Sequence, residues 1–447
     1  MPRRRQHAPL RVLLNNRLVG HLIKAPGGAI SFVYDRAWLD WKSALPVSLS
    51  LPLREEPYYG TPVAAVFENL LPDSDALRRR VAEKVGAAGA DTYSLLAAIG
   101  ADCVGALQFV AADNDDQDQD EYHYHGVDDT NTIVGTPVDD HAIEALLHGL
   151  AQTPLGLGRD DPFRLSVAGA QEKTALLWHD GRWFKPHGTT PTTHIFKTQI
   201  GQLPNGINLS DSVENEYYCL KLAEAFGLPV NQATMQCFGR TRALVIERFD
   251  RRWTPTGRLL RLPQEDCCQA LSVAPTRKYQ SDGGPGIVDV LTLLKGSDEP
   301  ATDQQTVLNA QILFWLIGAT DGHAKNFSVF LGPGGSYRLT PLYDVLTAQP
   351  SLDSRQITRK QLKLAMSVGD RRHYRIEEIV GRHFIQTGQE AGLPGTLVKE
   401  AIEGMADKAA GALEKTAQAL PADFPASIHE SVSRGVLRRV RQLTVQQ

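Results

Sequence analysis

The sequence has few cysteines and no long hydrophobic run. Its five cysteines are an odd number without a C-x-x-C pair, so neither a disulfide framework nor a zinc site is supported. The most apolar stretch, residues 312–319, falls far short of the roughly 20 residues needed to cross a bilayer. The apolar run after the basic N-terminus is too short for a signal peptide. We therefore expect a cytoplasmic protein that makes no membrane contact.

A strong charge of either sign is also lacking. The 47 basic and 51 acidic side chains leave a net charge of -4, which gives no global electrostatic reason to bind nucleic acid. The chain of 447 residues is too long for one ordinary core. We expect two domains or one large bilobed domain.

The N-terminal part has the pattern of a small α/β subdomain, which we assign to residues 1–137. Short apolar pieces separated by turn residues over positions 9–35 predict an antiparallel sheet. Helical spacing follows, Pro72 interrupts it, and Asp73 or Ser74 is expected to cap the next helix.

An acidic tract at residues 113–131 contains almost nothing apolar, so we expect a mobile loop there. His123 and His125 in this tract could bind a metal, but histidines among acidic residues are usually solvated.

The remaining residues, 138–447, are expected to form a larger domain with two lobes. Strand-like pieces around one strong helix predict a β-rich lobe at about 150–255, and "HDGRW" has the Asp-Gly signature of a tight hairpin. Residues 256–447 are mainly helical in pattern. They include a central buried helix that begins with a capping box of Thr302 and Gln305.

The stretch "GATDGHAKNFSVF", at 318–330, contains the candidate catalytic and metal-binding residues. Asp321 precedes Asn326 by five positions, and a predicted hairpin then leads to Asp344. Protein kinases have this spacing between a catalytic Asp and an Asn that binds Mg²⁺, followed by a second metal-binding Asp. The alternative is a loop whose Asp and Asn only form turns.

A kinase also needs an upstream strand lysine to bind the nucleotide phosphates, and Lys197 lies on a probable strand. Glu214 and Glu216 follow on the next helix; either could orient the lysine, and the sequence does not choose between them. The strand "ALVIERFD" is a candidate adenine hinge, with Glu247 and Phe249 at its end, although it could be an ordinary core strand.

The glycine motifs that usually cover phosphates are missing. No G-x-G-x-x-G precedes Lys197, and the chain contains no G-x-x-x-x-G-K-[ST]. The small residues of "SVAGAQEKT", at 166–174, allow close backbone approach and are the best substitute.

With these residues in place, the chain resembles the HipA family of type II toxin–antitoxin Ser/Thr protein kinases nearly end to end. The resemblance is carried by "SLSLPL", "ENLLPDS", "FRLSVAGAQEKTALL", "TPTTHIFK", "SVENEYYCLKLA", "VIERFDRRW", "LRLPQED", "SDGGPGI", "FWLIGATDGHAKNFSVF", "GGSYRLTPLYDV" and "LKLAM". It implies an α+β, bilobed kinase-like fold, with a nucleotide lobe, a helical lobe and the N-terminal α/β subdomain. It also implies the use of ATP and Mg²⁺.

The resemblance implies a role for each matching position. Asp321 is the implied catalytic base, and Asn326 and Asp344 are the implied metal ligands. The implied nucleotide contacts are Ala168, Gly169, Ala170, Gln171, Glu172, Lys173, Lys197, Glu247, Arg248, Phe249, His323, Ala324, Lys325, Asn326, Tyr343 and Asp344.

The same resemblance implies inhibitory autophosphorylation on Ser166 and a protein substrate that is an aminoacyl-tRNA synthetase, with glutamyl-tRNA synthetase the best guess. Its implied partner is a HipB-like DNA-binding antitoxin, through which the toxin would reach operator DNA indirectly. The stretch after His383 lacks the basic residues for direct DNA contact. We expect the Arg-rich tail, 434–441, to be a solvated helix face.

Two other functions fit parts of the pattern. A non-catalytic corepressor could keep the nucleotide fold and act only through its antitoxin, and a small-molecule kinase could use the same residues. The intact Lys197, Asp321, Asn326 and Asp344 argue against the corepressor.

Overall fold

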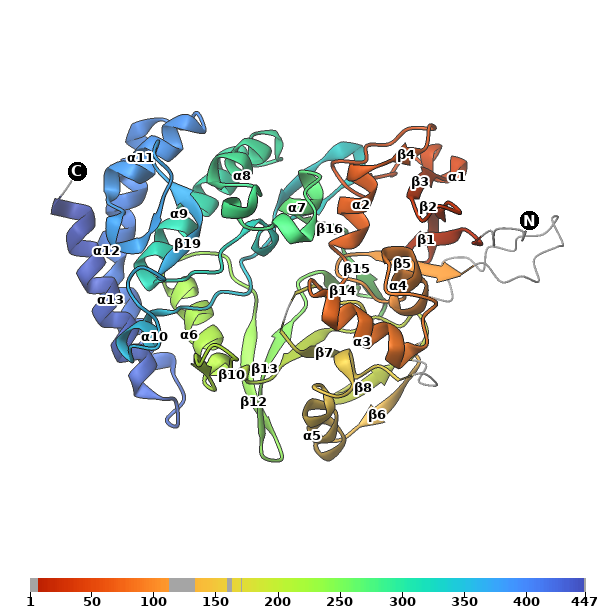
Figure 1. Cartoon of the computed structure of the whole chain (residues 1–447), viewed down its shortest axis with the longest axis horizontal. Helices are drawn as coiled ribbons and strands as arrows, with labels where there is room; N and C mark the ends of the chain where they lie inside the picture. The colour runs from red at the N-terminus through yellow and green to blue at the C-terminus, as the bar shows by residue number, and fades with distance from the viewer. Residues whose placement is uncertain (1–6, 112–132, 159–162, 170, 446–447) are drawn as a thin grey trace.

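The computed structural model describes residues 7–111, 133–158, 163–169 and 171–445. The predicted loop at 113–131, with His123 and His125, and the predicted nucleotide contact Ala170 lie outside the described residues. The N-terminal sheet and the C-terminal helices lie at opposite ends of the long axis, and a second sheet lies between them (Figure 1). This mixed α+β arrangement of strand-rich and helical parts confirms the predicted fold class.

The N-terminal part is built on an antiparallel sheet, as expected. Its strand order is β4-β3-β2-β1-β5, and alternate residues of β1 are buried, as one packed face requires. The strands are β1 (Leu10–Leu14), β2 (Arg17–Lys24), β3 (Ile30–Tyr34), β4 (Tyr58–Tyr59) and β5 (Leu107–Ala111). The accompanying helices are α1 (Arg36–Leu39), α2 (Thr61–Glu68), α3 (Asp75–Val85) and α4 (Thr92–Ile99).

Of the two candidate caps of α3, Ser74 takes that position. Its side chain accepts a hydrogen bond from the backbone N–H of Leu77. Asp73 is therefore left to interact elsewhere in the molecule.

A six-stranded antiparallel sheet forms the middle of the molecule, in the order β12-β13-β9-β7-β8-β6. Its strands are β6 (Gly135–Val138), β7 (Lys173–His179), β8 (Arg182–Pro186), β9 (His194–Lys197), β12 (Ala233–Phe238) and β13 (Thr241–Glu247). The helix α6 (Ser212–Ala225) packs against β12 and β13, and α5 (Asp140–Gly149) also contacts this sheet. The predicted hairpin is confirmed, since Asp180 and Gly181 both have positive φ between β7 and β8.

The C-terminal half is mainly helical and surrounds α9 (Pro300–Ile317), in which every residue from Ala310 to Ile317 is buried, as predicted for a central helix. The predicted capping box is wrong, because α9 begins at Pro300 and Thr302 already lies inside it. The other helices are α7 (Cys267–Ala270), α8 (Ile287–Leu293), α10 (Gln349–Asp353), α11 (Gly381–Glu390), α12 (Gly395–Ala419) and α13 (Ala426–Val445).

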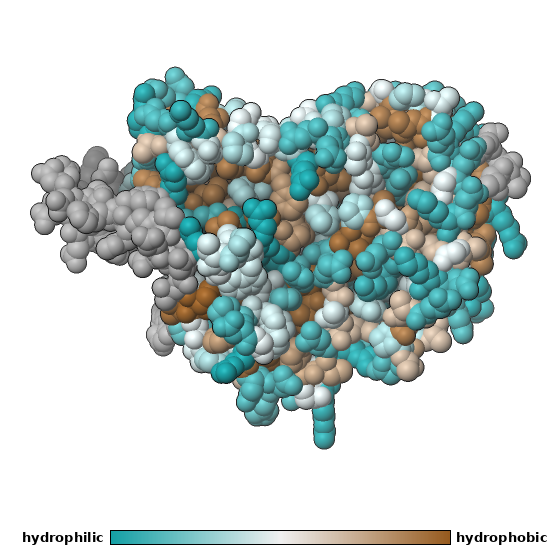
Figure 2. Space-filling model, turned by 180° about the vertical axis from the view of Figure 1, so that it is seen from behind, coloured by the Kyte–Doolittle hydropathy of each residue, from teal (hydrophilic) through white to brown (hydrophobic). Residues whose placement is uncertain are grey.

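Small sheets complete the described part of the fold. They consist of β10 (Gly201–Gln202) with β11 (Asn208–Leu209), β14 (Arg251–Trp253) with β15 (Leu259–Arg261), β16 (Gln264–Asp266) with β17 (Ser328–Leu331) and β18 (Tyr337–Leu339), and β19 (Lys363–Val368) with β20 (His373–Arg375). Hydrophilic side chains cover much of the face seen in Figure 2, with apolar patches between them.

The Arg-rich tail is only partly the solvated face that we expected. Arg434, Arg438 and Arg441 are exposed, but Arg439 is buried. Its Nε donates to the backbone carbonyl of Leu316, 2.7 Å away, at the end of α9. The tail therefore supports the helix that leads into the 318–330 segment.

Candidate active site

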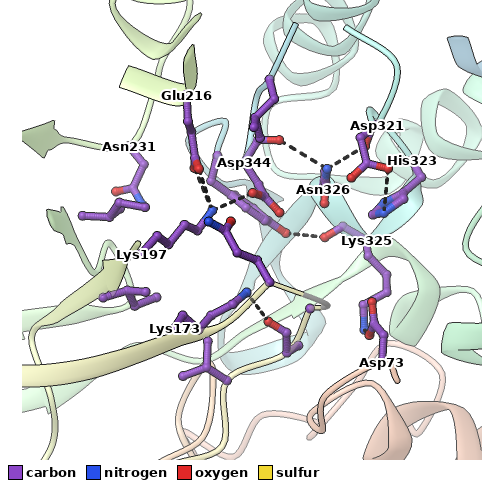
Figure 3. A pocket seen from close by; sticks show the side chains of 18 of the residues that line it. Asp73, Lys173, Lys197, Glu216, Asn231, Asp321, His323, Lys325, Asn326 and Asp344 are labelled. Atoms are coloured by element: carbon purple, nitrogen blue, oxygen red, sulfur yellow. Dashed lines mark hydrogen bonds and ion pairs between the residues drawn. The ribbon is translucent and has the colours of Figure 1, made fainter. Parts of the chain in front are cut away.

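A cavity of about 650 Å³ lies between the six-stranded sheet, α6, the 318–330 segment and the N-terminal part (Figure 3). Most of the predicted site residues line it. They are Ala168, Gly169, Gln171, Lys173, Lys197, Arg248, Phe249, Asp321, His323, Lys325, Asn326, Tyr343 and Asp344. Among the described residues, the predicted contacts Glu172, Glu247 and Ala324 are not part of its wall.

Lys197 is the buried cation at the centre of the cavity. It lies at the end of β9, between β7 and β13, as the sequence predicted. Its Nζ is 2.7 Å from Oε1 of Glu216 and 2.6 Å from Oδ1 of Asp344 (Figure 3). Glu214 instead pairs with Arg242 at 2.9 Å, because two positions along a helix turn a side chain to a different face. Glu216 is therefore the glutamate that orients the lysine.

The charges in this cluster reinforce one another. Burial opposes the charge of Lys197, but the carboxylates of Asp344 and Glu216 outweigh it and raise the pKa of the lysine. Burial likewise opposes the charge of Asp344, yet Lys197 and Lys173 hold the pKa of its carboxyl well below the usual range. Asp344 has φ of 58°, in the left-handed region that L-residues rarely adopt. A fully charged carboxylate is thus held in a strained backbone position.

Asn326 connects the two acidic segments. The helix α9 ends at Gly318 with a left-handed cap, and the chain then runs through Asp321 into the single turn Ala324–Asn326. The side-chain Nδ2 of Asn326 donates to the backbone carbonyl of Asp321, at 2.7 Å, and to that of Asp344, at 3.4 Å. The amide nitrogen thus holds the predicted base and the second predicted metal ligand in fixed relation.

Lys325 joins this loop to the N-terminal part of the chain. Its Nζ donates to Oδ1 of Asn69, 2.8 Å away, and lies 3.2 Å from Oδ1 of Asp73. Lys278 pairs with the other oxygen of Asp73 at 2.8 Å. The two lysines outweigh the effect of burial and lower the pKa of Asp73 to about 2. Sequence reasoning did not assign Asn69 or Asp73 to the site, since nothing in the sequence indicates which cation they meet.

The described residues of the 166–174 segment border the cavity and are held from the N-terminal side. Gly169 has φ of 109°, and a Cβ there would lie 2.5 Å from Nζ of Lys173, so only glycine fits. Lys173 donates to the carbonyl of Ala168 at 2.8 Å, and burial next to Lys197 lowers its pKa to about 8. Ser166 is fully buried and donates through Oγ to the carbonyl of Leu70 at 2.7 Å.

The strand end predicted as the adenine hinge offers fewer groups for binding a nucleotide than we expected. The guanidinium of Arg248 is buried and donates to Asp250, Thr192 and the carbonyl of Cys103. Its backbone is engaged as well, since the N–H donates to the carbonyl of Thr193 at 2.8 Å and the carbonyl accepts from the N–H of Arg251 at 3.1 Å. Phe249 forms an apolar wall, with its ring 5.7 Å from that of Tyr343. The phenol of Tyr343 donates to the carbonyl of Lys325 at 2.7 Å.

The cavity has the donor set that a magnesium nucleotide requires. Within the described residues, the amide oxygen of Asn326 and Oδ2 of Asp344 accept no hydrogen bond. Mg²⁺ is typically held by one or two protein oxygens together with substrate phosphates and water. In the cavity wall, His323 Nδ1 and Gln264 Oε1 are buried without a hydrogen-bond partner among the described residues, as suits a polar ligand.

These contacts define a kinase-type phosphotransferase site. In such a site a lysine on a strand pairs with a carboxylate on a helix. Beside them lie a loop with an Asp and an Asn and a second Asp that follows a hairpin. The chain belongs to the HipA family: residues 165–413 match the HipA-like C-terminal domain and residues 10–110 match the HipA N-terminal domain.

Individual relatives agree. Y4mE of Sinorhizobium fredii is 35% identical over 91% of this chain and 91% of its own length. The serine/threonine-protein kinase toxin HipA of Shewanella oneidensis is 28% identical, over 81% of this chain and 78% of its own. The structure of the Shewanella oneidensis MR-1 toxin–antitoxin system, HipA, HipB and its operator DNA, aligns with a TM-score of 0.77 and 25% identity, covering 97% of each chain.

By this homology the chain is a HipA-like serine/threonine protein kinase, the toxin type of a toxin–antitoxin system. A kinase implies ATP as the phosphoryl donor. Within the part of the chain that the structure describes, no helix is both long and apolar enough to cross a membrane.

Proposed function

We propose that this kinase transfers the γ-phosphoryl group of ATP to a serine or threonine hydroxyl of a protein, with Asp321 as general base. The observation that carries the proposal is the convergence of Lys197, Glu216, Asp344, Asn326 and Asp321 on one cavity from separate segments. A magnesium ion bound with ATP would neutralise the negative charge of the phosphates.

Each residue has a distinct task in this proposal. Asn326 and Asp344 would hold the metal through their unbonded side-chain oxygens. Lys197, fixed by Glu216, would bind the nucleotide phosphates. The side chain of Asp321 is 47% exposed, so a hydroxyl of another protein can reach its carboxylate and lose a proton to it.

The nucleotide would lie along the sheet side of the cavity. The small residues 168–169 and the ammonium of Lys173 would cover the phosphates. Phe249 offers an apolar surface to the base.

We further propose that Ser166 is an inhibitory autophosphorylation site. Its hydroxyl is buried against the carbonyl of Leu70 and does not line the cavity, so phosphorylation requires the 166–174 segment to leave its place. A phosphate carries nearly two negative charges and cannot return to a site built around a carbonyl acceptor. Modification would thus keep the segment away from the phosphate site.

We propose a HipB-like antitoxin as partner, through which the kinase reaches operator DNA, in line with the composition of the Shewanella complex. The proposed substrate is an aminoacyl-tRNA synthetase, with glutamyl-tRNA synthetase the leading candidate. Its phosphorylation in the cytoplasm would stop tRNA charging, translation and growth.

The experiment is incubation of the purified protein with γ-labelled ATP and a bacterial extract, followed by identification of the modified residues by mass spectrometry. We expect label on Ser166 and on a serine or threonine of a synthetase. Asp321→Gln should abolish both labels and the growth arrest. Arrest by a stably folded Asp321→Gln protein would refute the kinase mechanism, and label on another protein would refute the proposed substrate.

A further inference from the structure

Tyr279 makes a direct contact with the proposed catalytic base. Its phenol donates a hydrogen bond to Oδ1 of Asp321, and its ring lies edge-on to the ring of His323, with centroids 4.9 Å apart. None of the sequence reasoning assigned Tyr279 a role. The contact joins a segment before α8 to the loop that follows α9.

The tyrosine is held independently of Asp321 by a tight turn. The N–H of Gly284 donates to the carbonyl of Tyr279 at 3.0 Å, and a Cβ at Gly284 would lie 1.8 Å from the carbonyl oxygen of Arg277. The next residue, Gln280, accepts hydrogen bonds through Oε1 from the N–H and the hydroxyl of Ser367, at 2.7 and 2.9 Å. The turn is thus anchored to β19 and requires glycine. The turn therefore holds the phenol of Tyr279 in a fixed position next to Asp321.

The two oxygens of the Asp321 carboxylate have different surroundings. Oδ1 accepts the bond from Tyr279, and Nε2 of His323 lies 3.7 Å from this same oxygen. In the described part of the chain, Oδ2 accepts no hydrogen bond, and nearly half of the side chain is exposed. One oxygen is therefore anchored and the other is available to a substrate.

We propose that Tyr279 is a positioning residue for phosphoryl transfer, which fixes the Asp321 carboxylate through Oδ1 so that Oδ2 faces the incoming hydroxyl. The inference rests on the proposed role of Asp321. In the reaction, the hydroxyl proton passes to Asp321 and the hydroxyl oxygen bonds to the γ-phosphorus. The bond from that phosphorus to the β-γ bridging oxygen breaks, and ADP leaves.

The phenol keeps its own proton throughout. Burial and the neighbouring Asp321 carboxylate both raise the pKa of Tyr279. Tyr279 therefore acts as a fixed hydrogen-bond donor and does not exchange protons with the substrate.

The opposite role would be a blocking one, in which the phenol occupies the place of the substrate hydroxyl. The two roles predict changes of opposite sign when the hydroxyl is removed. Tyr279→Phe deletes this single oxygen and keeps the ring against His323.

The test compares full-length wild type, Tyr279→Phe and the control Tyr337→Phe in transfer of label from γ-labelled ATP to proteins of a bacterial extract. Tyr337 is a good control because its phenol donates to the carbonyl of Leu293, outside the cavity. We expect Tyr279→Phe to lower the maximal rate by about 10- to 100-fold while the KM for ATP stays within about twofold. The control should keep the wild-type rate and KM. A Tyr279→Phe rate equal to or above that of wild type would overturn the proposal.

Asp321→Asn, measured alongside, separates this inference from the proposed function. If Asp321→Asn keeps the wild-type rate, Asp321 is not the base, and the proposed positioning role of Tyr279 is then wrong as well. If Asp321→Asn is inactive and Tyr279→Phe is not impaired, only the positioning role is wrong.

A second variant keeps the test decisive if Tyr279→Phe does not fold. Gln280→Ala removes the anchor to Ser367 without touching Asp321. It should lower the maximal rate by a smaller factor, again with the KM for ATP unchanged. A wild-type rate in Gln280→Ala would then overturn the proposal.

Discussion

Oδ1 of Asp73 lies 3.2 Å from Nζ of Lys325, so the N-terminal part of the chain reaches the loop that carries the proposed base. Asn69 bonds to the same ammonium, and the N–H of Asp73 donates to the carbonyl of Gly169 above the cavity. The segment 69–73 therefore contacts both the catalytic loop and the segment over the phosphate site. The N-terminal part forms one wall of the site.

Asp73→Asn should impair both catalysis and stability. The substitution leaves Lys325 and Lys278 without their shared carboxylate, and loss of these largely buried pairs should lower the free energy of unfolding by about 2 kcal/mol. Label transfer from ATP should fall by about tenfold. The exposed Asp75→Asn, in the first turn of α3, is the matched control for denaturation and transfer assays. Equal behaviour of the two variants would contradict the structural role of Asp73.

The two glutamates of α6 should behave differently. Glu216→Gln weakens the pairing that holds Lys197, so we expect weaker ATP binding and a transfer rate about 10- to 100-fold lower. Glu214→Gln affects only the contacts to Arg242 and Gln199, away from the nucleotide, and should change the rate by less than about threefold. Calorimetric titration with ATP and the transfer assay measure both effects. A larger loss in Glu214→Gln would reverse the assignment.

ATP affinity should depend on pH through Lys173. Its pKa is about 8 without ligand, and bound phosphate favours the charged ammonium and raises that pKa. Binding therefore takes up a proton above pH 8, and affinity should be constant below that pH. Above it, affinity should fall by up to about tenfold per pH unit. Calorimetry from pH 7 to pH 9.5 tests this, and Lys173→Met should show weaker binding without this dependence. If ATP affinity depends on pH equally in wild type and Lys173→Met, the role of Lys173 is contradicted.

Asp102→Asn should destabilise the fold strongly. Asp102 is fully buried and pairs with Arg248, Arg251 and Arg261, which hold the pKa of its carboxyl well below the usual range despite burial. Arg248 and Arg251 keep Asp250 as a partner, but Arg261 loses its only carboxylate among the described residues. We expect a loss of about 3–5 kcal/mol in the free energy of unfolding.

The matched control is Asp180→Asn, because Asp180 is exposed in a hairpin turn that also suits asparagine. Denaturant titration should show a change below about 0.5 kcal/mol for this control. Because the carboxyl of Asp102 has a lowered pKa when folded, its contribution is present at neutral pH and is lost as the pH falls below about 4. A stable Asp102→Asn protein would contradict this account of the charge cluster.

Several features that depend on residues close together in the sequence were predicted correctly. The spacing of Asp321 and Asn326, the strand position of Lys197 and the Asp-Gly hairpin depend on neighbours in sequence, and the structure has each of them. The boundary near residue 137 stays a prediction; β6 pairs with β8 and so belongs to the central sheet.

Contacts between distant segments could not be predicted in the same way. The sequence analysis put Glu214 and Glu216 on the same helix and left open which one pairs with Lys197, because that choice depends on where the lysine lies in the fold. The contacts of Asp73 and Tyr279 likewise depend on tertiary packing, which leaves no local pattern in one sequence. The capping box failed because Pro300 at the first helical position starts α9 earlier.

The most direct test of the central claim is the rate of label transfer from γ-labelled ATP to serine or threonine in wild type and Asp321→Asn, with ATP affinity measured on both. The account predicts a rate at least about a hundredfold lower for Asp321→Asn, with an affinity within about threefold of wild type. A wild-type rate in the folded Asp321→Asn protein would contradict it.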